Sequence, residues 1–224
     1  NKEMVEESDL DKSVERVLMG PEKKSHIMSK KEKEITAFHE SGHALLSLIL
    51  PEVNPLKKVS VIPRGLAGGY TFTPPLEDRH YWTKKELSAE IAMMLGGRAS
   101  EEINLSEVTT GAQNDLEMAT GMARRMVTQF GMSEKLGNIT LGRREGLVFL
   151  GKDIMEEKNY SEETARLIDE EVRHIVEEAY GKAKSLLQQN VDKLKTLSGA
   201  LIEKEVMSGD EVKRLLGIEK SDLA

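Results

Sequence analysis

The segment EITAFHESGHALLSLIL, residues 34–50, constrains this chain most, because it predicts both a helix and a metal site. His39 and His43 are four residues apart, and an α-helix turns about 100° per residue, so both imidazoles lie on one face. Both rings can therefore reach one ion at about 2.0–2.1 Å. Glu40 points at a different angle, beside that ion, where a general base that acts on water would stand.

A metal site of this kind needs a third protein ligand, which the residues directly after His43 do not provide, because residues 44–50 are mostly apolar. The pair Glu101 and Glu102 in GGRASEE is one candidate. Its alternatives are a solvated pair at a helix end, or a glutamate that orients a ligating histidine through its other ring nitrogen.

Asp115 in TTGAQNDLEMAT is the other candidate for the third ligand. An unpaired carboxylate on an apolar helix face is costly to bury, so Asp115 is expected to bind a cation. The alternative is an acidic residue near a helix start that interacts favourably with the helix dipole. The apolar residues on its stripe are Met118, Ala119, Met122 and Met126.

Two imidazoles, one carboxylate and an open fourth position favour Zn²⁺ as the ion, although manganese and iron accept the same ligands. The chain contains no cysteine, which excludes thiolate ligands and disulfides. The sequence therefore predicts a zinc site made of nitrogen and oxygen ligands.

Composition limits the other functions open to the chain. Of the 224 residues 38% are hydrophobic, 32% charged and 4% aromatic, which is typical of a helix-rich soluble domain. The net charge is −7 and basic residues are scattered among acidic ones, so we expect no nucleic-acid partner. No apolar run approaches about 20 residues, and GKAKS lacks the first glycine of a phosphate-binding loop. We therefore expect neither a membrane span nor an ATP site in this sequence.

The pattern along the chain predicts a mainly α fold with one small β-hairpin or short sheet. A capping box of Ser29 and Glu32 opens the helix that carries both histidines. Alternating apolar residues in 58–63 and 68–74 predict the hairpin. Helices then follow to the end of the chain. The first runs from a capping box at Thr83 and Glu86 through GGRASEEI, and the second starts at a capping box of Thr110 and Gln113. Two more helices are predicted over about 161–189 and 191–205. The last helix starts at a capping box of Ser208 and Glu211.

Residues 1–20 have the pattern of a short amphipathic helix that ends at Gly20-Pro21 and is followed by a basic linker. A single helix cannot bury its own apolar face. We therefore interpret residues 1–28 as the end of another domain and residues 29–224 as the domain that carries the metal site.

Six motifs occur together in an order that resembles one protein family. HESGH, IPRG, GGRASEE, TTGAQNDLEMAT, FGMSEKLG and YSEETARLIDEEV are similar to motifs of FtsH-type, membrane-anchored, ATP-dependent zinc metalloproteases. The resemblance extends from about Asp11 to Leu216, and DLDKSVERVLMGPEKKS resembles the last helix of that family's AAA ATPase module. Ser41 and Ser100 stand where the family more often has alanine, which is also small.

The resemblance implies a helical, zincin-like protease domain with zinc held by His39, His43 and Asp115 and with Glu40 as the catalytic base. It also implies a homo-hexameric ring beneath an ATPase ring, and a membrane segment elsewhere in the full-length chain. The implied location is the cytoplasmic face of the inner cell membrane, with this part of the chain soluble. The implied substrates are unfolded or damaged proteins.

The residues leave two further alternatives open. An unfolded chain can add to the edge of the hairpin by main-chain hydrogen bonds, or the hairpin only covers the core. The competing function is a non-catalytic helical ring-assembly module with a structural metal, against which Glu40 argues because a structural site needs no general base. His26, His80 and His174 have no partner at ligand spacing, and we interpret them as linker, loop and helix-surface residues.

Overall fold

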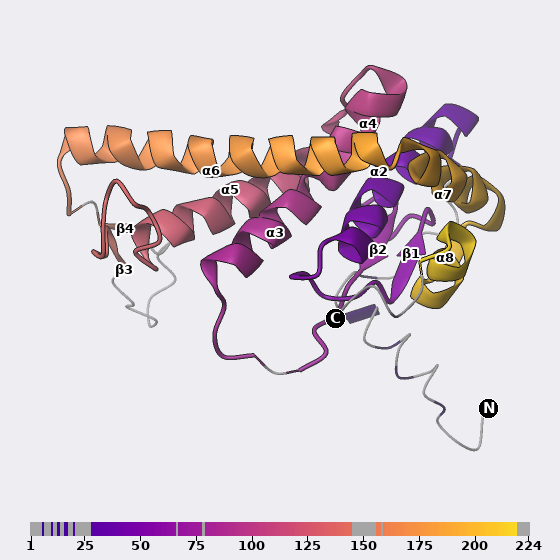
Figure 1. Cartoon of the computed structure of the whole chain (residues 1–224), viewed down its shortest axis with the longest axis horizontal. Helices are drawn as coiled ribbons and strands as arrows, with labels where there is room; N and C mark the ends of the chain where they lie inside the picture. The colour runs from indigo at the N-terminus through magenta and orange to yellow at the C-terminus, as the bar shows by residue number, and fades with distance from the viewer. Residues whose placement is uncertain are drawn as a thin grey trace.

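The computed structural model shows a mainly helical chain with a small antiparallel sheet, as predicted (Figure 1). Within its described part, no helix is both long and apolar enough to cross a membrane. The structure describes residues 28–65, 67–77, 79–144, 156–157 and 159–218, together with residues 6, 10, 13, 16, 17 and 20. The predicted helix at 1–20 and the linker with His26 therefore lie largely outside the described residues, and the division at residue 28 stays a prediction.

The helices follow the predicted capping signals in most cases. Ser29 and Glu32, and Thr83 and Glu86, form the predicted reciprocal capping boxes, because each pair satisfies two backbone donors at a helix start. The helices are α2 (Lys30–Ile49), α3 (Lys84–Met94), α4 (Gly96–Leu105), α5 (Gln113–Thr128), α6 (Glu162–Gln189), α7 (Val191–Lys204) and α8 (Gly209–Leu216), with the short 3-10 helix η1 (Thr110–Ala112).

The sheet near the histidine helix has three short antiparallel strands in the order β2-β1-β5. The predicted hairpin supplies β1 (Lys58–Ser60) and β2 (Tyr70–Phe72), which are shorter than expected. The third strand, β5 (Val206–Ser208), comes from the far end of the chain and was not predicted. The chain directly after β5 packs very closely on the segment before β1, because a Cβ at Gly209 would lie 1.9 Å from the carbonyl oxygen of Leu56. A separate pair, β3 (Arg143–Arg144) and β4 (Glu156–Glu157), is antiparallel and distant in Figure 1.

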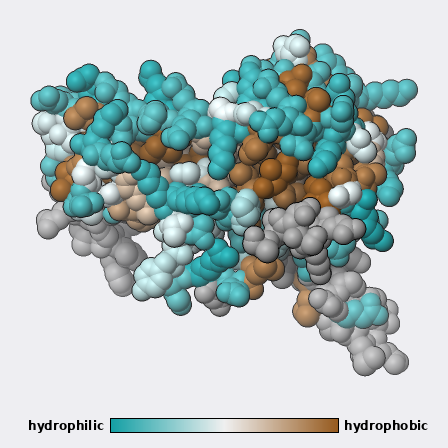
Figure 2. Space-filling view, viewed as in Figure 1, coloured by the Kyte–Doolittle hydropathy of each residue, from teal (hydrophilic) through white to brown (hydrophobic). Residues whose placement is uncertain are grey.

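The long helix α6 runs along one side of the molecule and packs against α3, α4 and α5 (Figure 1). Helix α2 lies at one end of this group, where it packs against α4, α7 and the sheet. Hydrophilic residues cover most of the surface along α6 in Figure 2, so the apolar side of this helix faces inward. The largest fully buried side chains are Leu45, Leu46, Ile91, Leu95, Met126, Ile168, Leu187, Leu194, Leu197, Leu201 and Met207.

Two predictions about the helices are wrong. The helix expected from Thr83 through GGRASEEI is two helices, because α3 ends at Met94 and α4 starts at Gly96, with Leu95 as the residue between them. The expected capping box of Thr110 and Gln113 is absent. Instead the hydroxyl of Thr109 accepts a hydrogen bond from the amide of Gly111 and opens η1, which then continues into α5.

Candidate metal centre

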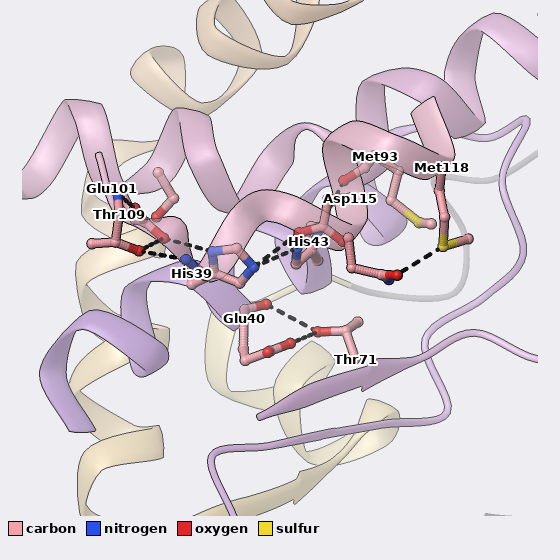
Figure 3. A network of polar contacts seen from close by, with 12 residues as sticks. His39, Glu40, His43, Thr71, Met93, Glu101, Thr109, Asp115 and Met118 are labelled. Atoms are coloured by element: carbon pink, nitrogen blue, oxygen red, sulfur yellow. Dashed lines mark hydrogen bonds and ion pairs between the residues drawn. The ribbon is translucent and has the colours of Figure 1, made fainter. Parts of the chain in front are cut away.

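Helix α2 brings His39 and His43 to the interior of the molecule. The two rings lie one turn apart with their centroids 4.8 Å from each other. His43 is buried and His39 is nearly so, and both face α4 and α5 in Figure 3. The spacing that suggested a shared ion therefore corresponds to two neighbouring rings in the structure.

His43 is fixed in one tautomer by its second ring nitrogen. Its Nδ1 donates to the backbone carbonyl oxygen of Met93, on α3, at 2.8 Å. A carbonyl oxygen can only accept, so Nδ1 carries a proton, and in the neutral ring the lone pair is on Nε2. Nε2 is therefore available as a metal ligand.

Three potential ligand atoms meet at one point, from residues that are far apart in the sequence. His39 Nε2 lies 3.1 Å from His43 Nε2 and 3.1 Å from Asp115 Oδ2. His43 Nε2 lies 3.4 Å from the same carboxylate oxygen. Ligands of a tetrahedral zinc ion lie roughly 3.3–3.5 Å from one another, so this triangle has nearly the size that the ion needs. Among the described residues, this is the one group of three histidine or acidic side chains arranged to hold a metal.

Asp115 reaches the two rings from the first turn of α5. Its helix face is apolar, as expected, at Ala119 and Met126, which are fully buried. Met118, however, is 50% exposed, so Asp115 lies at the rim of the apolar face and is itself partly exposed. The centre is therefore accessible to solvent on the side of Asp115.

Glu101 does not join the triangle but contacts His39 from behind. Its Oε1 lies 2.7 Å from His39 Nδ1, and its side chain is completely buried. The amide of Thr109 donates to the other carboxylate oxygen at 2.7 Å and holds Glu101 in place. This arrangement matches the alternative in which a glutamate orients a ligating histidine through the ring nitrogen that faces away from the ion.

Glu102, the next residue of α4, points elsewhere. It accepts a hydrogen bond from Lys184 Nζ at 2.7 Å and a very short one from the hydroxyl of Tyr180, both on α6. Its side chain is 40% exposed. Glu102 therefore links two helices and is neither a ligand candidate nor a partner of the histidines.

Glu40 lies beside the triangle and is buried, with an exposed fraction of 5%. The hydroxyl of Thr71, on β2, donates to its carboxylate at 2.8 Å (Figure 3). The carboxylate of Glu40 makes no hydrogen bond to His39 or His43. It is thus held next to the three ligand atoms without being one of them.

The charges around His39 favour a cation at this centre. Burial lowers the pKa of His39, but hydrogen bonds to Asp115 and Glu101 outweigh burial and raise the pKa to about 10. Burial raises the pKa of Asp115 and of Glu101, yet the histidine contacts prevail and each pKa lies below its usual value. For Glu40 burial prevails, and its pKa is raised. Acids that hold a proton on histidine also favour a metal ion, which competes with that proton for the ring nitrogen.

Glycines in α2 and α4 allow the two helices to approach this closely. At Gly42 there is no room for a side chain, since a Cβ there would lie 2.3 Å from the carbonyl oxygen of Gly96. Gly97 was missed. A Cβ there would lie 2.6 Å from the Nε2 atoms of both His39 and His43. The glycine pair that opens GGRASEE is the signal that could have identified it.

The contact of Thr71 with Glu40 was also not predicted, because in the sequence Thr71 is only a polar residue of an alternating strand. Of the other histidines that the structure describes, neither His80 nor His174 takes part in the centre. His80 and His174 are exposed, and His174 lies 3.9 Å from Glu178 on the surface of α6.

Residues 26–215 match the family described as peptidase family M41. The chain is 49% identical over 212 residues to the ATP-dependent zinc metalloprotease FtsH 1 of Thermoanaerobacter sp. (strain X514), which covers 95% of this chain and 35% of that protein. It is 46% identical over 217 residues to the ATP-dependent zinc metalloprotease FtsH of Bacillus subtilis (strain 168), and this match covers 96% of the present chain and 34% of that protein. The chain thus spans about a third of the length of these relatives. Since the family match covers most of its residues, the chain belongs to peptidase family M41.

Proposed function

We propose that this chain is the zinc-dependent endopeptidase domain of an ATP-driven protease, with zinc held by His39, His43 and Asp115 and with Glu40 as the general base. The observation that carries the proposal is the triangle of two Nε2 atoms and one carboxylate oxygen, 3.1–3.4 Å apart, with a buried carboxylate beside it. Three protein ligands leave the fourth position of a tetrahedral zinc open, as in catalytic zinc sites.

Bound zinc would supply an acidified water and a Lewis acid for the scissile carbonyl. The remaining chemistry belongs to Glu40, which removes a proton from the water as the peptide carbonyl is attacked. The same carboxyl group then delivers that proton to the leaving amide nitrogen, so that one water and one peptide bond give a carboxylic acid and an amine. Glu101 supports this chemistry by keeping the Nε2 of His39 directed at the ion.

The substrate proposed for the site is an unfolded polypeptide. Strand β2 is an edge of its sheet and carries Thr71, the hydrogen-bond partner of Glu40, so a chain paired with β2 would pass the base. Pairing by backbone hydrogen bonds depends little on side chains, which suits a protease that degrades many sequences. The alternative, in which the strands only cover the core, predicts that changing the backbone of the substrate leaves cleavage unaffected.

The full-length protein is proposed to resemble its relatives, whose names describe ATP-dependent zinc metalloproteases. In this proposal residues 1–28 lead from an ATPase module to the protease domain at 29–224, and the protein forms a homo-hexamer. A membrane segment outside this sequence would hold the ring at the cytoplasmic face of the inner membrane.

The variant Glu40→Gln tests the function, because it removes the base and keeps the shape of the side chain. We expect peptide hydrolysis to fall by about 10²–10⁴-fold, with the zinc content unchanged by elemental analysis. Normal hydrolysis by Glu40→Gln would refute the role of Glu40. The non-catalytic assembly module with a structural metal would be supported if the wild-type chain bound zinc but cleaved no unfolded protein, such as casein.

The variant Asp115→Asn tests the ligand set, with Glu102→Gln, which changes a nearby carboxylate outside the centre, as the control. We expect Asp115→Asn to lose most of its zinc, because the amide is a much weaker ligand than the carboxylate. Glu102→Gln is expected to keep its zinc, since that carboxylate contacts α6. Retention of zinc by Asp115→Asn together with its loss from Glu102→Gln would show that the assignment is wrong.

A further inference from the structure

Thr71 occupies the middle of β2, opposite Val59 of β1. Its neighbours Tyr70 and Phe72 are buried, whereas Thr71 is partly exposed. Side chains alternate between the two faces of a strand, so Thr71 points to the face opposite its neighbours, toward α2 and Glu40 (Figure 3).

The hydroxyl of Thr71 makes a specific contact with Glu40. Thr71 Oγ1 lies 2.8 Å from Glu40 Oε2 and 3.2 Å from the backbone carbonyl oxygen of Glu40. A hydroxyl has a single proton, and the shorter distance favours donation to the carboxylate. Among the described residues, Thr71 is the one side chain that hydrogen-bonds to this carboxylate.

The hairpin cannot move freely over this carboxylate, because its backbone packs directly on α2. A Cβ at Gly69, one residue before β2, would lie 2.8 Å from Thr36 Cγ2 and 2.9 Å from Glu40 Cγ. It would also lie 2.6 Å from the carbonyl oxygen of Ser60 in β1. The distance between the strand and the base is therefore set by the close packing of the Gly69 backbone between side chains of α2 on one side and the backbone of β1 on the other.

The backbone of Thr71 faces the other way from that of its neighbours. The carbonyl oxygen of Phe72 accepts a hydrogen bond from the amide of Lys57 at 2.9 Å, so the polar groups of Phe72 face β1. Consecutive residues of a strand direct these groups to opposite edges. The amide and carbonyl of Thr71 therefore face the outer edge of the sheet, where a further strand would pair.

We propose that Thr71 is a positioning residue for Glu40: its hydroxyl holds the carboxylate in the orientation for proton transfer, and its backbone faces the edge where the substrate pairs. One residue thus joins the edge strand to the base, so that the base is aligned with whatever chain is bound at the edge. The inference rests on the proposed function, since it assumes that Glu40 is the base.

The first experiment compares Thr71→Val, which keeps the branched shape without the hydroxyl, with Thr71→Ser, which keeps the hydroxyl. We expect kcat for an unstructured peptide to fall about 10- to 100-fold in Thr71→Val, because a misaligned group costs catalysis far more than binding. KM should stay within about threefold, and Thr71→Ser should retain most of the kcat. Thr73→Val is the matched control, since Thr73 lies just beyond β2 and makes no hydrogen bond to Glu40.

The second experiment measures the base without turnover. A peptide hydroxamate chelates zinc and its hydroxyl group donates to a neighbouring carboxylate. We expect its Kd, measured by calorimetry, to rise about three- to tenfold in Thr71→Val, the effect of one impaired hydrogen bond. The Kd of Thr71→Ser and Thr73→Val should match that of the wild type, and the zinc content should be the same in all variants.

The outcomes separate this inference from the proposed function. Wild-type kcat in Thr71→Val, together with an inactive Glu40→Gln, overturns the positioning role and leaves Glu40 as the base. Equal loss in Thr71→Ser and Thr71→Val also overturns it, because the hydroxyl would not be the cause, and so does loss of zinc from Thr71→Val. An active Glu40→Gln refutes the proposed function itself.

Discussion

Helix α4 packs against both α2 and α6, and the two contacts are built from different parts of the chain. Toward α2 the backbone of α4 comes very close, since a Cβ at Gly42 would lie 2.3 Å from the carbonyl oxygen of Gly96 and one at Gly97 would lie 2.6 Å from the Nε2 atoms of His39 and His43. Toward α6 it is made by long polar side chains, with Glu102 bound by Lys184 and Tyr180.

The two contacts differ because the atoms on the α2 side must be positioned more precisely than those on the α6 side. Ligand atoms around a metal must keep their positions within a few tenths of an ångström, and close packing at glycines, with no flexible side chain between the helices, provides that rigidity. Side chains such as Lys184 can adjust their rotamers, so the α6 contact stabilises the helices without setting the geometry of the centre. Glu101 and Glu102 are neighbours in the sequence, yet Glu101 contacts His39 on α2 and Glu102 contacts Lys184 on α6. The reason is that consecutive residues of a helix point about 100° apart.

The largest effect is expected for Gly97→Ala on the α2 side. The new methyl group would lie 2.6 Å from the Nε2 atoms of His39 and His43, so the rings must separate or α4 must move. We expect zinc affinity, measured by competition with a chelating dye, to fall by at least about 100-fold, with matching loss of hydrolysis. Wild-type zinc affinity in this variant would mean that α4 can shift away from α2, so that the close contact of these helices does not set the geometry of the centre.

A smaller effect is expected for Glu101→Gln, which keeps the size of the side chain that supports His39. The amide binds the Nδ1 proton less strongly than the carboxylate, so we expect zinc affinity to fall about 10- to 100-fold. Glu102→Gln, one residue along α4, should change zinc affinity by less than about twofold, because its carboxylate contacts only α6. Equal effects in the two variants would show that both contacts of α4 support the metal.

On the α6 side, Glu171 offers a test by pH. Burial raises its pKa, but hydrogen bonds from Lys135 and Ser133 lower it more, and its pKa lies below the usual value. The resulting stability is present above the pKa of the unfolded chain and is lost as the pH falls through the lower pKa of the folded chain. We expect Glu171→Gln to reduce the free energy of unfolding by about 1–2 kcal/mol at pH 7.

This loss should shrink as urea unfolding is measured at decreasing pH below the usual glutamate pKa, because the wild type then loses the same charge. Zinc affinity at pH 7 should be unaffected, since the carboxylate of Glu171 pairs with Ser133 and Lys135, in the loop after α5, and not with a residue of the centre. If Glu171→Gln lowered the free energy of unfolding by the same amount at all pH values, the charge of Glu171 would not be what stabilises the contact between α6 and the loop after α5.

The smallest effect is expected for Gly181→Ala on α6, the same substitution as at Gly97 but with the opposite sign. No heavy atom lies within 4 Å of a Cβ at Gly181, so the methyl group meets open space. Replacing a glycine inside a helix by alanine should raise the free energy of unfolding by about 0.5–1 kcal/mol. Thermal or urea unfolding measures this gain, and destabilisation by Gly181→Ala would contradict the looser packing assigned to α6.

Local sequence signals predicted those parts of the fold that depend on neighbouring residues. The capping box at Ser29 and Glu32 and the four-residue spacing of His39 and His43 act within one helix, so the sequence alone indicates them. The break at Leu95 was missed because residues 84–105 have the pattern of a single helix. The close approach of α4 to α2, which favours two helices there, is a tertiary contact that this pattern does not contain. Strand β5 was missed because its partner β1 lies almost 150 residues earlier in the chain.

By itself the sequence determined a mainly helical domain and predicted that two histidines and a glutamate lie near one ion, because one helical turn fixes the relative directions of their side chains. It narrowed the third ligand to Asp115 or the pair Glu101 and Glu102, and the resemblance favoured Asp115. Only the tertiary structure decided that Asp115 completes the triangle while Glu101 supports His39 from behind. The physical reason is that these acids come from separate helices, and the distance between helices depends on packing that no local pattern encodes.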